Sequence, residues 1–323
     1  MAEKELRIGL LTSGGDAPGM NAVIRAVVRT AAFHNIRVYG IKTGFEGLFK
    51  GDIDELTPDD VSGIIHRGGT ILRTARCAEM MSKEGQSRAA EVCKVMRLDA
   101  VIVLGGDGSL KGALSLAQQG VGAIGIPCTI DLDMECTEYT IGFDTAVNTA
   151  ADAIIHIRDT SSSHERCSVV EVMGRNAGYL ALWCGLTGGA EEVIIPENPV
   201  DTNSVTEQIL RNRAKGKRHN LIVVAEGVGG SDNIAKELER VLGIEARATV
   251  LGHLQRGGTP SAVDRMHATL MGHMAVEAIK NGDVNKAAVF RNGRHELIDL
   301  SEALETKREY DPMMYEVTKI LAI

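Results

Sequence analysis

Apolar and polar positions along the 323-residue chain follow two alternating patterns. Short runs rich in isoleucine and valine occupy residues 7–11, 101–104, 123–126, 168–172, 193–195 and 221–225. Nearly continuous apolar runs of this length predict strands covered on both faces, as in parallel sheets. The amphipathic segments between them predict helices over 17–33, 144–159, 177–186, 205–214 and 261–280. This alternation predicts an α/β fold of parallel βαβ units, with helices flanking the sheets.

Chain length and a change of pattern suggest two lobes. A chain of 323 residues favours two lobes over one compact unit. We place the lobe boundary near Gly142, where one strand-and-helix half gives way to the next.

Composition narrows the functional class. Hydrophobic residues make up 44% of the chain and charged residues 24%, which is typical of a folded globular protein. The net charge of -8 and the absence of a long Lys/Arg run argue against a nucleic-acid partner. No apolar stretch is long enough to span a membrane. The six cysteines form no C-x-x-C pair, so we expect neither disulfides nor a zinc site, and a cytoplasmic location.

Glycine-rich turns that directly follow predicted strands are the places to search for chemistry, because ligands bind at the carboxyl ends of strands in such sheets. The first, residues 12–19, would let the backbone near Gly15 approach a phosphate, although an ordinary tight turn is the alternative. The second, Gly105-Gly106-Asp107-Gly108-Ser109, places one carboxylate among glycines. Asp107 there suits a hydrated Mg²⁺ ion, or caps the next helix.

Two further turns add acid and basic groups. Thr129, Asp131 and Asp133 follow the strand at 123–126, and an extended backbone would put both carboxylates on one side. One acid could then accept a proton from a sugar hydroxyl, although two solvated loop acids are the alternative. Arg175 follows the strand at 168–172 and could stabilise a transferring phosphoryl group, or simply form a salt bridge.

The second half of the chain supplies further groups for a sugar phosphate. Glu226 follows the strand at 221–225 and suits a sugar hydroxyl. Arg247, His253 and Arg256 lie within ten residues and suggest a cationic set that clamps a phosphate.

These motifs together resemble 6-phosphofructokinase of the bacterial, ATP-dependent type. The resemblance rests on residues 12–21, 105–109, 129–133, 171–175 and 252–258, in the family's order and spacing, and it covers nearly the whole chain. It implies a kinase of glycolysis that transfers the γ-phosphate of Mg²⁺-ATP to the 1-hydroxyl of fructose 6-phosphate. It also implies a larger nucleotide-binding lobe, residues 1–142 plus 255–305, and a smaller sugar-phosphate-binding lobe, residues 143–254 plus 306–323.

The resemblance assigns roles to individual residues. Asp131 would be the base, with Thr129 and Arg175 supporting the transition state, and Asp107 would bind magnesium. The residues expected at the nucleotide are Gly15, Arg76, Cys77, Gly105, Gly106, Asp107, Gly108 and Ser109. Those expected at fructose 6-phosphate are Thr129, Asp131, Asp133, Met173, Gly174, Arg175, Glu226, His253 and Arg256. Arg166 and Arg247 would reach across from a neighbouring subunit of a homotetramer, so that sites are shared between subunits.

Several positions depart from the family pattern. Cys128, Leu132 and Cys136 stand where relatives have Gly, Asn and Gly, and Met81 stands where relatives often have a cation. We expect an added Cβ at Cys128 to hinder phosphate approach, and Cys136 to disfavour a turn with positive φ. A sugar-phosphate-binding paralogue with weak or no catalysis, or a pyrophosphate-dependent kinase, are the alternatives to an active ATP enzyme.

A regulatory site is expected only in altered form. The resemblance places an ADP or phosphoenolpyruvate effector at Arg25, Arg29, Arg158, Glu191, Lys215 and Lys217. Pro58 and Gly63 stand where relatives often have Arg and Asp. We therefore expect altered or weakened control by these effectors, and the alternative for the cations is an ordinary basic surface.

Overall fold

The computed structural model describes residues 5–199, 202–308 and 310–322. These residues form two compact units. Unit 1 comprises the described residues within 1–130, 134–145 and 256–308, and unit 2 those within 131–133, 146–255 and 309–323. The expected roles of the two lobes, in nucleotide binding and in sugar-phosphate binding, stay predictions.

Unit 1 is built on a seven-stranded sheet in the order β11-β10-β5-β4-β1-β2-β3. Its strands are β1 (Arg7–Thr12), β2 (Arg37–Ile41), β3 (Ile53–Leu56), β4 (Ala100–Gly105), β5 (Gly122–Pro127), β10 (Lys286–Arg291) and β11 (Arg294–Asp299). The central strands pair in parallel, and every residue of β4 is buried because helices cover both faces. The edge pairs β2–β3 and β10–β11 are antiparallel, which the parallel pattern did not predict.

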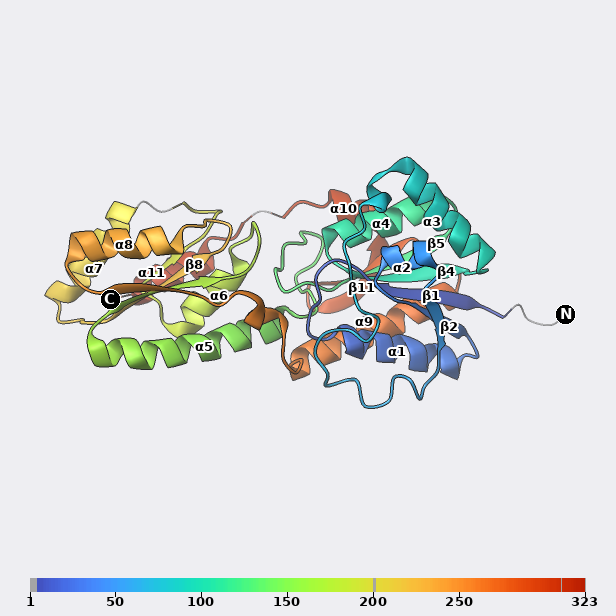
Figure 1. Ribbon diagram of the computed structural model, residues 1–323, viewed down its shortest axis with the longest axis horizontal. Helices are drawn as coiled ribbons and strands as arrows, with labels where there is room; N and C mark the ends of the chain where they lie inside the picture. The colour runs from blue at the N-terminus through green and yellow to red at the C-terminus, as the bar shows by residue number, and fades with distance from the viewer. Residues whose placement is uncertain (1–4, 200–201, 309, 323) are drawn as a thin grey trace. The chain divides into compact units, whose positions relative to one another are not determined.

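Helices cover the two faces of the unit 1 sheet (Figure 1). Its helices are α1 (Met20–Phe33), α2 (Phe45–Lys50), α3 (Lys83–Val95), α4 (Asp107–Gln118), α9 (Ala262–Lys280) and α10 (Leu300–Glu305), with the short η1 (Glu79–Met81). Helices α1 and α9 pack together on one face, and α2, α3, α4 and α10 lie on the other. Branched residues of β4 and β1, such as Val101, Val103 and Leu11, form the core with α4.

Unit 2 contains a four-stranded parallel sheet in the order β7-β8-β6-β9. Its strands are β6 (Cys167–Val172), β7 (Glu192–Ile194), β8 (Asn220–Ala225) and β9 (Ala246–Val250). Its helices are α6 (Tyr179–Gly188), α7 (Thr202–Ala214), α8 (Ser231–Leu242) and α11 (Met313–Leu321), and η2 (Gly252–Arg256) follows β9. The first three residues of helix α5 (Phe143–His164) belong to unit 1, and the rest of the helix belongs to unit 2.

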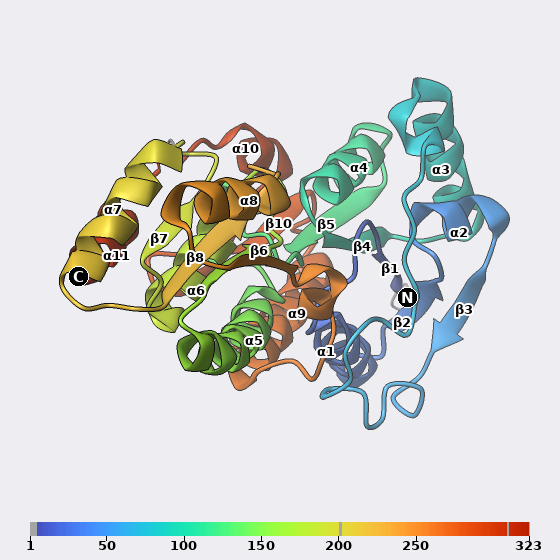
Figure 2. The same cartoon turned by 60° about the vertical axis from the view of Figure 1, so that its left-hand side comes forward.

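Side chains of β7 alternate between the two faces of the unit 2 sheet. Ile194 lies in the core that α7 and α8 close, whereas Val193 meets Gly185 of α6 on the other face. Figure 2 shows α8 and α6 on opposite sides of β6 and β8. No helix in the described ranges combines the length and apolar character needed to cross a bilayer.

Candidate active site

Three adjacent parallel strands of unit 1 end at one edge of the sheet, where the predicted donor residues follow them. Strands β1, β4 and β5 are neighbours in the sheet. The turns that contain Ser13, Asp107 and Cys128 follow the carboxyl ends of these three strands, in that order. The turns are tied together: Ser13 N–H donates to the Leu104 carbonyl at 2.9 Å, and Cys128 N–H donates to the Gly105 carbonyl at 3.0 Å. The structure therefore brings the three predicted loops to one place.

The turn after β1 is held by a neighbouring segment that the sequence also singled out. Thr74 Oγ1 donates to the Gly14 carbonyl at 2.9 Å, so the stretch that leads to Arg76 and Cys77 runs along this turn. Arg76 is exposed, whereas Cys77 packs against the core. A Cβ on Gly15 would lie 2.4 Å from Nη1 of Arg256, so a larger residue there would displace the guanidinium from this turn.

Asp107 is the first residue of α4, and it does not cap that helix. Gly106 occupies the N-cap position, and Asp107 Oδ2 lies 2.7 Å from Lys111 Nζ. The Asp107 side chain is 44% exposed, and a Cβ on Gly108 would meet no atom within 4 Å. One accessible carboxylate at a helix N-terminus with room for phosphates fits Mg²⁺, which takes few protein ligands and completes its shell with water and phosphate.

The loop after β5 differs from expectation in two ways. Leu132 has φ 53°, so residues 131–133 are not extended, and the simple alternation that would place Asp131 and Asp133 on one side does not hold. Cys136 does not adopt a positive φ, so its replacement of glycine causes no strain of that kind.

The Cys128 side chain is 1% exposed and lies inside the protein. Burial, with a smaller contribution from the Asp264 carboxylate, raises the pKa of the Cys128 thiol. The thiol therefore faces the interior and not an open phosphate site, contrary to the expectation that it hinders phosphate approach.

In unit 2 the carboxyl ends of β6, β8 and β9 carry the groups expected at the sugar. Glu226 follows β8, and its Oε1 accepts hydrogen bonds from the N–H groups of Gly174 at 3.2 Å and Arg175 at 2.7 Å. Arg175 has φ 54°, an uncommon backbone conformation for a residue other than glycine. The hydrogen bonds from Gly174 N–H and Arg175 N–H to Glu226 hold the backbone in this conformation. Gln255, which the sequence analysis missed, accepts from Met173 N–H at 3.3 Å.

Arg175 also joins the acid loop. Its Nη1 lies 3.1 Å from Asp133 Oδ2, and the Asp133 side chain is only 18% exposed. Asp131, two residues earlier, is 2% exposed. The ion pair alone would fit the alternative of a structural salt bridge, but both partners belong to segments that carry other predicted site residues.

Arg166 and Arg247 do not lie with these residues. Arg166 precedes β6 and Arg247 is near the start of β9, at the amino edge of the sheet, while His253 follows β9 at the other edge. Glu245 holds both arginines, with Nε to carboxylate distances of 2.5 and 2.6 Å, and they lower its pKa. Within unit 2, Arg247 and His253 of the predicted cationic set thus lie at opposite ends of β9. Its third member, Arg256, belongs to unit 1 and donates to the Asp16 carbonyl at 3.2 Å.

The residues expected at an effector divide between the units. Arg25 and Arg29 lie one turn apart on α1 of unit 1. In unit 2, Arg158 donates to the Gly188 carbonyl at 2.6 Å, and Lys217 Nζ lies 2.7 Å from the buried Glu191 carboxylate. Lys215 is exposed nearby in the chain.

Asp264, in the first turn of α9, is a structural residue of unit 1 that the sequence analysis missed. It accepts hydrogen bonds from the Tyr139 hydroxyl at 2.5 Å, the Gly142 N–H at 2.7 Å and the Thr145 N–H at 2.9 Å. Burial outweighs these bonds and raises its pKa. The one sequence signal was the Ser261-x-x-Asp264 capping pattern, whose Ser261 accepts from Asp264 N–H at 3.2 Å.

The chain is similar to known proteins in sequence and in structure. The ATP-dependent 6-phosphofructokinase of Clostridium botulinum is 50% identical over 315 residues, covering 98% of this chain and 99% of the relative. The ATP-dependent 6-phosphofructokinase 1 of Clostridium perfringens is 51% identical with the same coverage. Phosphofructokinase of Saccharomyces cerevisiae superposes with a TM-score of 0.86 at 34% identity, covering 98% of this chain and 47% of the yeast chain.

The family profile described as Phosphofructokinase matches residues 7–279, which include the four turns that carry the predicted loops. The relatives also match over nearly the full length of this chain. The chain therefore belongs to the phosphofructokinase family.

Proposed function

We propose that this chain is an ATP-dependent 6-phosphofructokinase, which phosphorylates the 1-hydroxyl of fructose 6-phosphate and yields fructose 1,6-bisphosphate and ADP. One observation carries the proposal: the turns after β1, β4 and β5 meet at one edge of unit 1, and the third continues into the acids of the 131–133 segment. Clostridial relatives that are 50% identical carry the name of this activity.

The donor half of the reaction belongs to the unit 1 edge. Backbone amides near Gly15 and at the start of α4, at Gly108 and Ser109, would face the phosphates of ATP. Asp107 would hold Mg²⁺, which when bound neutralises phosphate charge. Ser109 is buried and donates to the Ser13 carbonyl at 3.0 Å, so it ties the two phosphate-facing turns into one structure.

The acceptor half needs a base near the sugar hydroxyl. Asp131 would take the proton of the 1-hydroxyl as its oxygen attacks the γ-phosphorus and ADP leaves. Arg175, whose backbone Glu226 fixes, would balance charge on the transferring group together with Thr129. Asp133 would orient the Arg175 guanidinium for this role through their 3.1 Å ion pair.

Fructose 6-phosphate would be bound by Met173, Glu226, His253 and Arg256. Arg166 and Arg247 lie at the opposite edge of the unit 2 sheet from Met173 and Glu226, which supports their serving the site of a neighbouring subunit in a homotetramer. Control by ADP or phosphoenolpyruvate at the Arg158–Lys217 region, and a cytoplasmic location, stay predictions.

A direct assay tests the activity. Purified chain is incubated with fructose 6-phosphate and either Mg²⁺-ATP or Mg²⁺-pyrophosphate, and fructose 1,6-bisphosphate is measured. We expect turnover with ATP that an Asp131→Asn variant lowers at least about 100-fold, because the variant lacks the base. Product from pyrophosphate alone, or fructose 6-phosphate binding without product from either donor, would contradict the proposal.

A further inference from the structure

The segment that follows the acid loop is fastened to a distant part of unit 1. Met134 and Cys136 are buried in the core, at 4% and 2% exposure. Glu138 N–H donates to the Phe290 carbonyl at 2.8 Å, and Asn292 N–H donates to a Glu138 carboxylate oxygen at 3.1 Å. Residues 134–138 therefore lie along the turn between β10 and β11.

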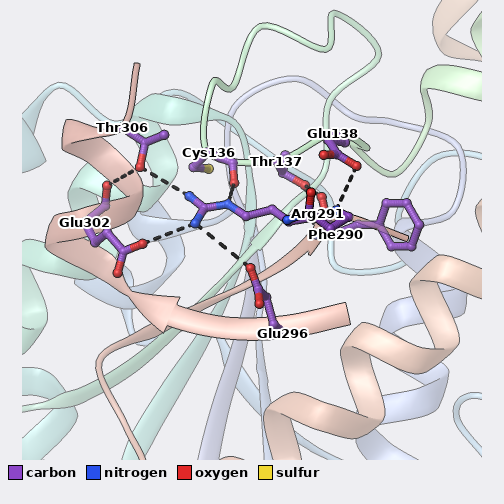
Figure 3. Close-up of polar contacts among 9 residues, drawn as sticks. Cys136, Thr137, Glu138, Phe290, Arg291, Glu296, Glu302 and Thr306 are labelled. Carbon is purple, nitrogen blue, oxygen red and sulfur yellow. Dashed lines mark hydrogen bonds and ion pairs between the residues drawn. The ribbon is translucent and has the colours of Figure 1, made fainter. Parts of the chain in front are cut away.

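Arg291, the last residue of β10, is the centre of this attachment (Figure 3). Its Nε donates to the Cys136 carbonyl at 2.7 Å. Its Nη1 lies 3.2 Å from a Glu302 carboxylate oxygen, and its Nη2 donates to Thr306 Oγ1 at 3.2 Å. The Arg291 side chain, which is 21% exposed, thus joins the loop segment to the end of α10.

The loop is also closed at its base. Cys128 and Ile141 form a parallel bridge, and Ile141 N–H donates to the Pro127 carbonyl at 3.1 Å. Residues 127–128 are bonded to Ile141, and residues 134–138 are bonded to the β10–β11 turn. The conformation of the stretch that carries Thr129 and Asp131 therefore depends on where residues 134–138 are held. Arg291 holds that end at a backbone carbonyl.

We propose that Arg291 is a positioning residue for phosphoryl transfer: it fixes the Cys136 carbonyl and thereby sets the placement of Asp131, five residues earlier. This inference rests on the proposed function, since it takes Asp131 as the base. A displacement of about 1 Å in a catalytic group can lower a rate about 100-fold.

The shape of the arginine side chain is essential to this role. The Nε atom of the planar guanidinium donates to the Cys136 carbonyl, while Nη1 and Nη2 contact Glu302 and Thr306 at the end of α10. Lysine has no equivalent geometry. Met173, Glu226 and His253, which are expected to bind the sugar, belong to other segments of the chain than the 128–141 loop that Arg291 fastens. Loss of Arg291 should therefore affect kcat more than the KM for fructose 6-phosphate.

Steady-state kinetics of the full chain test the proposal. We expect Arg291→Met to lower kcat about 10-fold while the KM for fructose 6-phosphate changes less than about 3-fold. Arg291→Lys should recover part of kcat, because lysine can still donate to one acceptor. The control is Arg294→Met: Arg294 is the exposed cross-strand partner of Arg291 in the hairpin, and its loss should leave kcat unchanged.

Amide hydrogen exchange gives a readout that does not depend on activity. In Arg291→Met the Glu138 amide should exchange at least about 10-fold faster than in Arg294→Met. Thr306→Val, a milder change, should shift kcat and exchange in the same direction by about 2-fold.

Unchanged exchange in Arg291→Met, or an equal kcat loss in Arg294→Met, would overturn the proposal. So would a lower melting temperature with no change in kcat per folded molecule. A wild-type chain that makes no fructose 1,6-bisphosphate would contradict the proposed function and with it the positioning role, even if exchange showed the Arg291 attachment to be intact.

Discussion

Leu132 has a backbone conformation that leucine rarely adopts, and its side chain is nevertheless buried. Its φ is 53° and its exposure 6%. The left-handed conformation costs a leucine about 1–2 kcal/mol, while burial of the side chain contributes about 1.5–3 kcal/mol. The two effects oppose each other, and burial is the larger. Burial of the leucine side chain thus stabilises a turn whose backbone conformation is unfavourable for leucine.

Substitutions at Leu132 separate these two effects. Leu132→Asn should lower the free energy of unfolding by about 1 kcal/mol, because lost burial exceeds the relief of the backbone. Leu132→Ala loses similar burial but keeps the backbone cost, so it should be less stable than the Asn variant by about 0.5–1 kcal/mol. Urea unfolding of the three proteins measures this order. An Ala variant as stable as the Asn variant would show that backbone conformation is not limiting.

Asp107 offers a test of the magnesium site at the same scale. Asp107→Asn should raise the free Mg²⁺ concentration needed for half-maximal rate about 10-fold and lower kcat, because a neutral amide binds a hard cation poorly. Lys111→Met removes only the ion pair with Asp107 and should leave kcat within about 3-fold of wild type. Rates measured against free Mg²⁺ provide the readout. If both variants keep the wild-type Mg²⁺ dependence, Asp107 is an ordinary first-turn acid.

At the scale of elements, continuous apolar runs predicted β1, β4, β5, β6, β7 and β8, and the sequence analysis did not predict β2, β3, β9, β10 and β11. The run at 101–104 became β4, and the periodic segment at 261–280 became α9, because helices and strands in a two-faced core need that pattern. Strand β11 and helix α3 were missed, because their sequences are largely polar and their stability comes from long-range packing.

The same distinction holds at the site. The turns that contain Asp107 and Thr129 were found because glycines and acids follow obvious strands. The left-handed Leu132 and Arg175 could not be found, since their conformations depend on partners distant in sequence, such as Glu226.

Helix α9 contributes a histidine whose protonation should weaken unit 1. His267 is 5% exposed, stacks on Tyr139 at 4.0 Å and shares a 2.9 Å hydrogen bond with His295. Burial, and then the neighbouring His295, lower the pKa of His267 to about 4. The folded state thus favours the neutral ring. Its contribution is complete above about pH 6.5 and is lost as pH falls toward 4.

Unfolding measured at pH 7.5 and pH 4.5 tests this effect. In wild type the His267 contribution to the loss should be on the order of 3 kcal/mol across its titration. His267→Phe keeps an aromatic ring against Tyr139 but cannot be protonated, so its stability should fall less between the two pH values. His273→Phe, at an exposed position of the same helix, is the control and should behave like wild type. An equal pH dependence in all three proteins would exclude His267 as the cause.

At the scale of the whole molecule, the residues predicted to bind the sugar phosphate divide between the amino ends and the carboxyl ends of the unit 2 strands. Arg247 pairs with Ser168 near the start of β6, whereas His253 follows the end of β9. Val250 lies three residues after Arg247 along β9, a span of about 10 Å. Glu245 holds Arg166 and Arg247 on the amino side. The proposed sugar site would therefore receive these arginines from another subunit.

Mixed oligomers test this requirement. Arg247→Ala and His253→Ala should each be nearly inactive, but co-expression of the two chains should restore about a quarter of wild-type activity. Each shared site draws its His253 from one subunit and its Arg247 from another, and random pairing leaves both intact in about one site of four. Arg166→Ala mixed with Arg247→Ala is the control. Every neighbour then lacks one of the two arginines, so no site is complete and activity should stay low. If the first mixture is also inactive, Arg247 serves its own chain and the shared-site assignment is wrong.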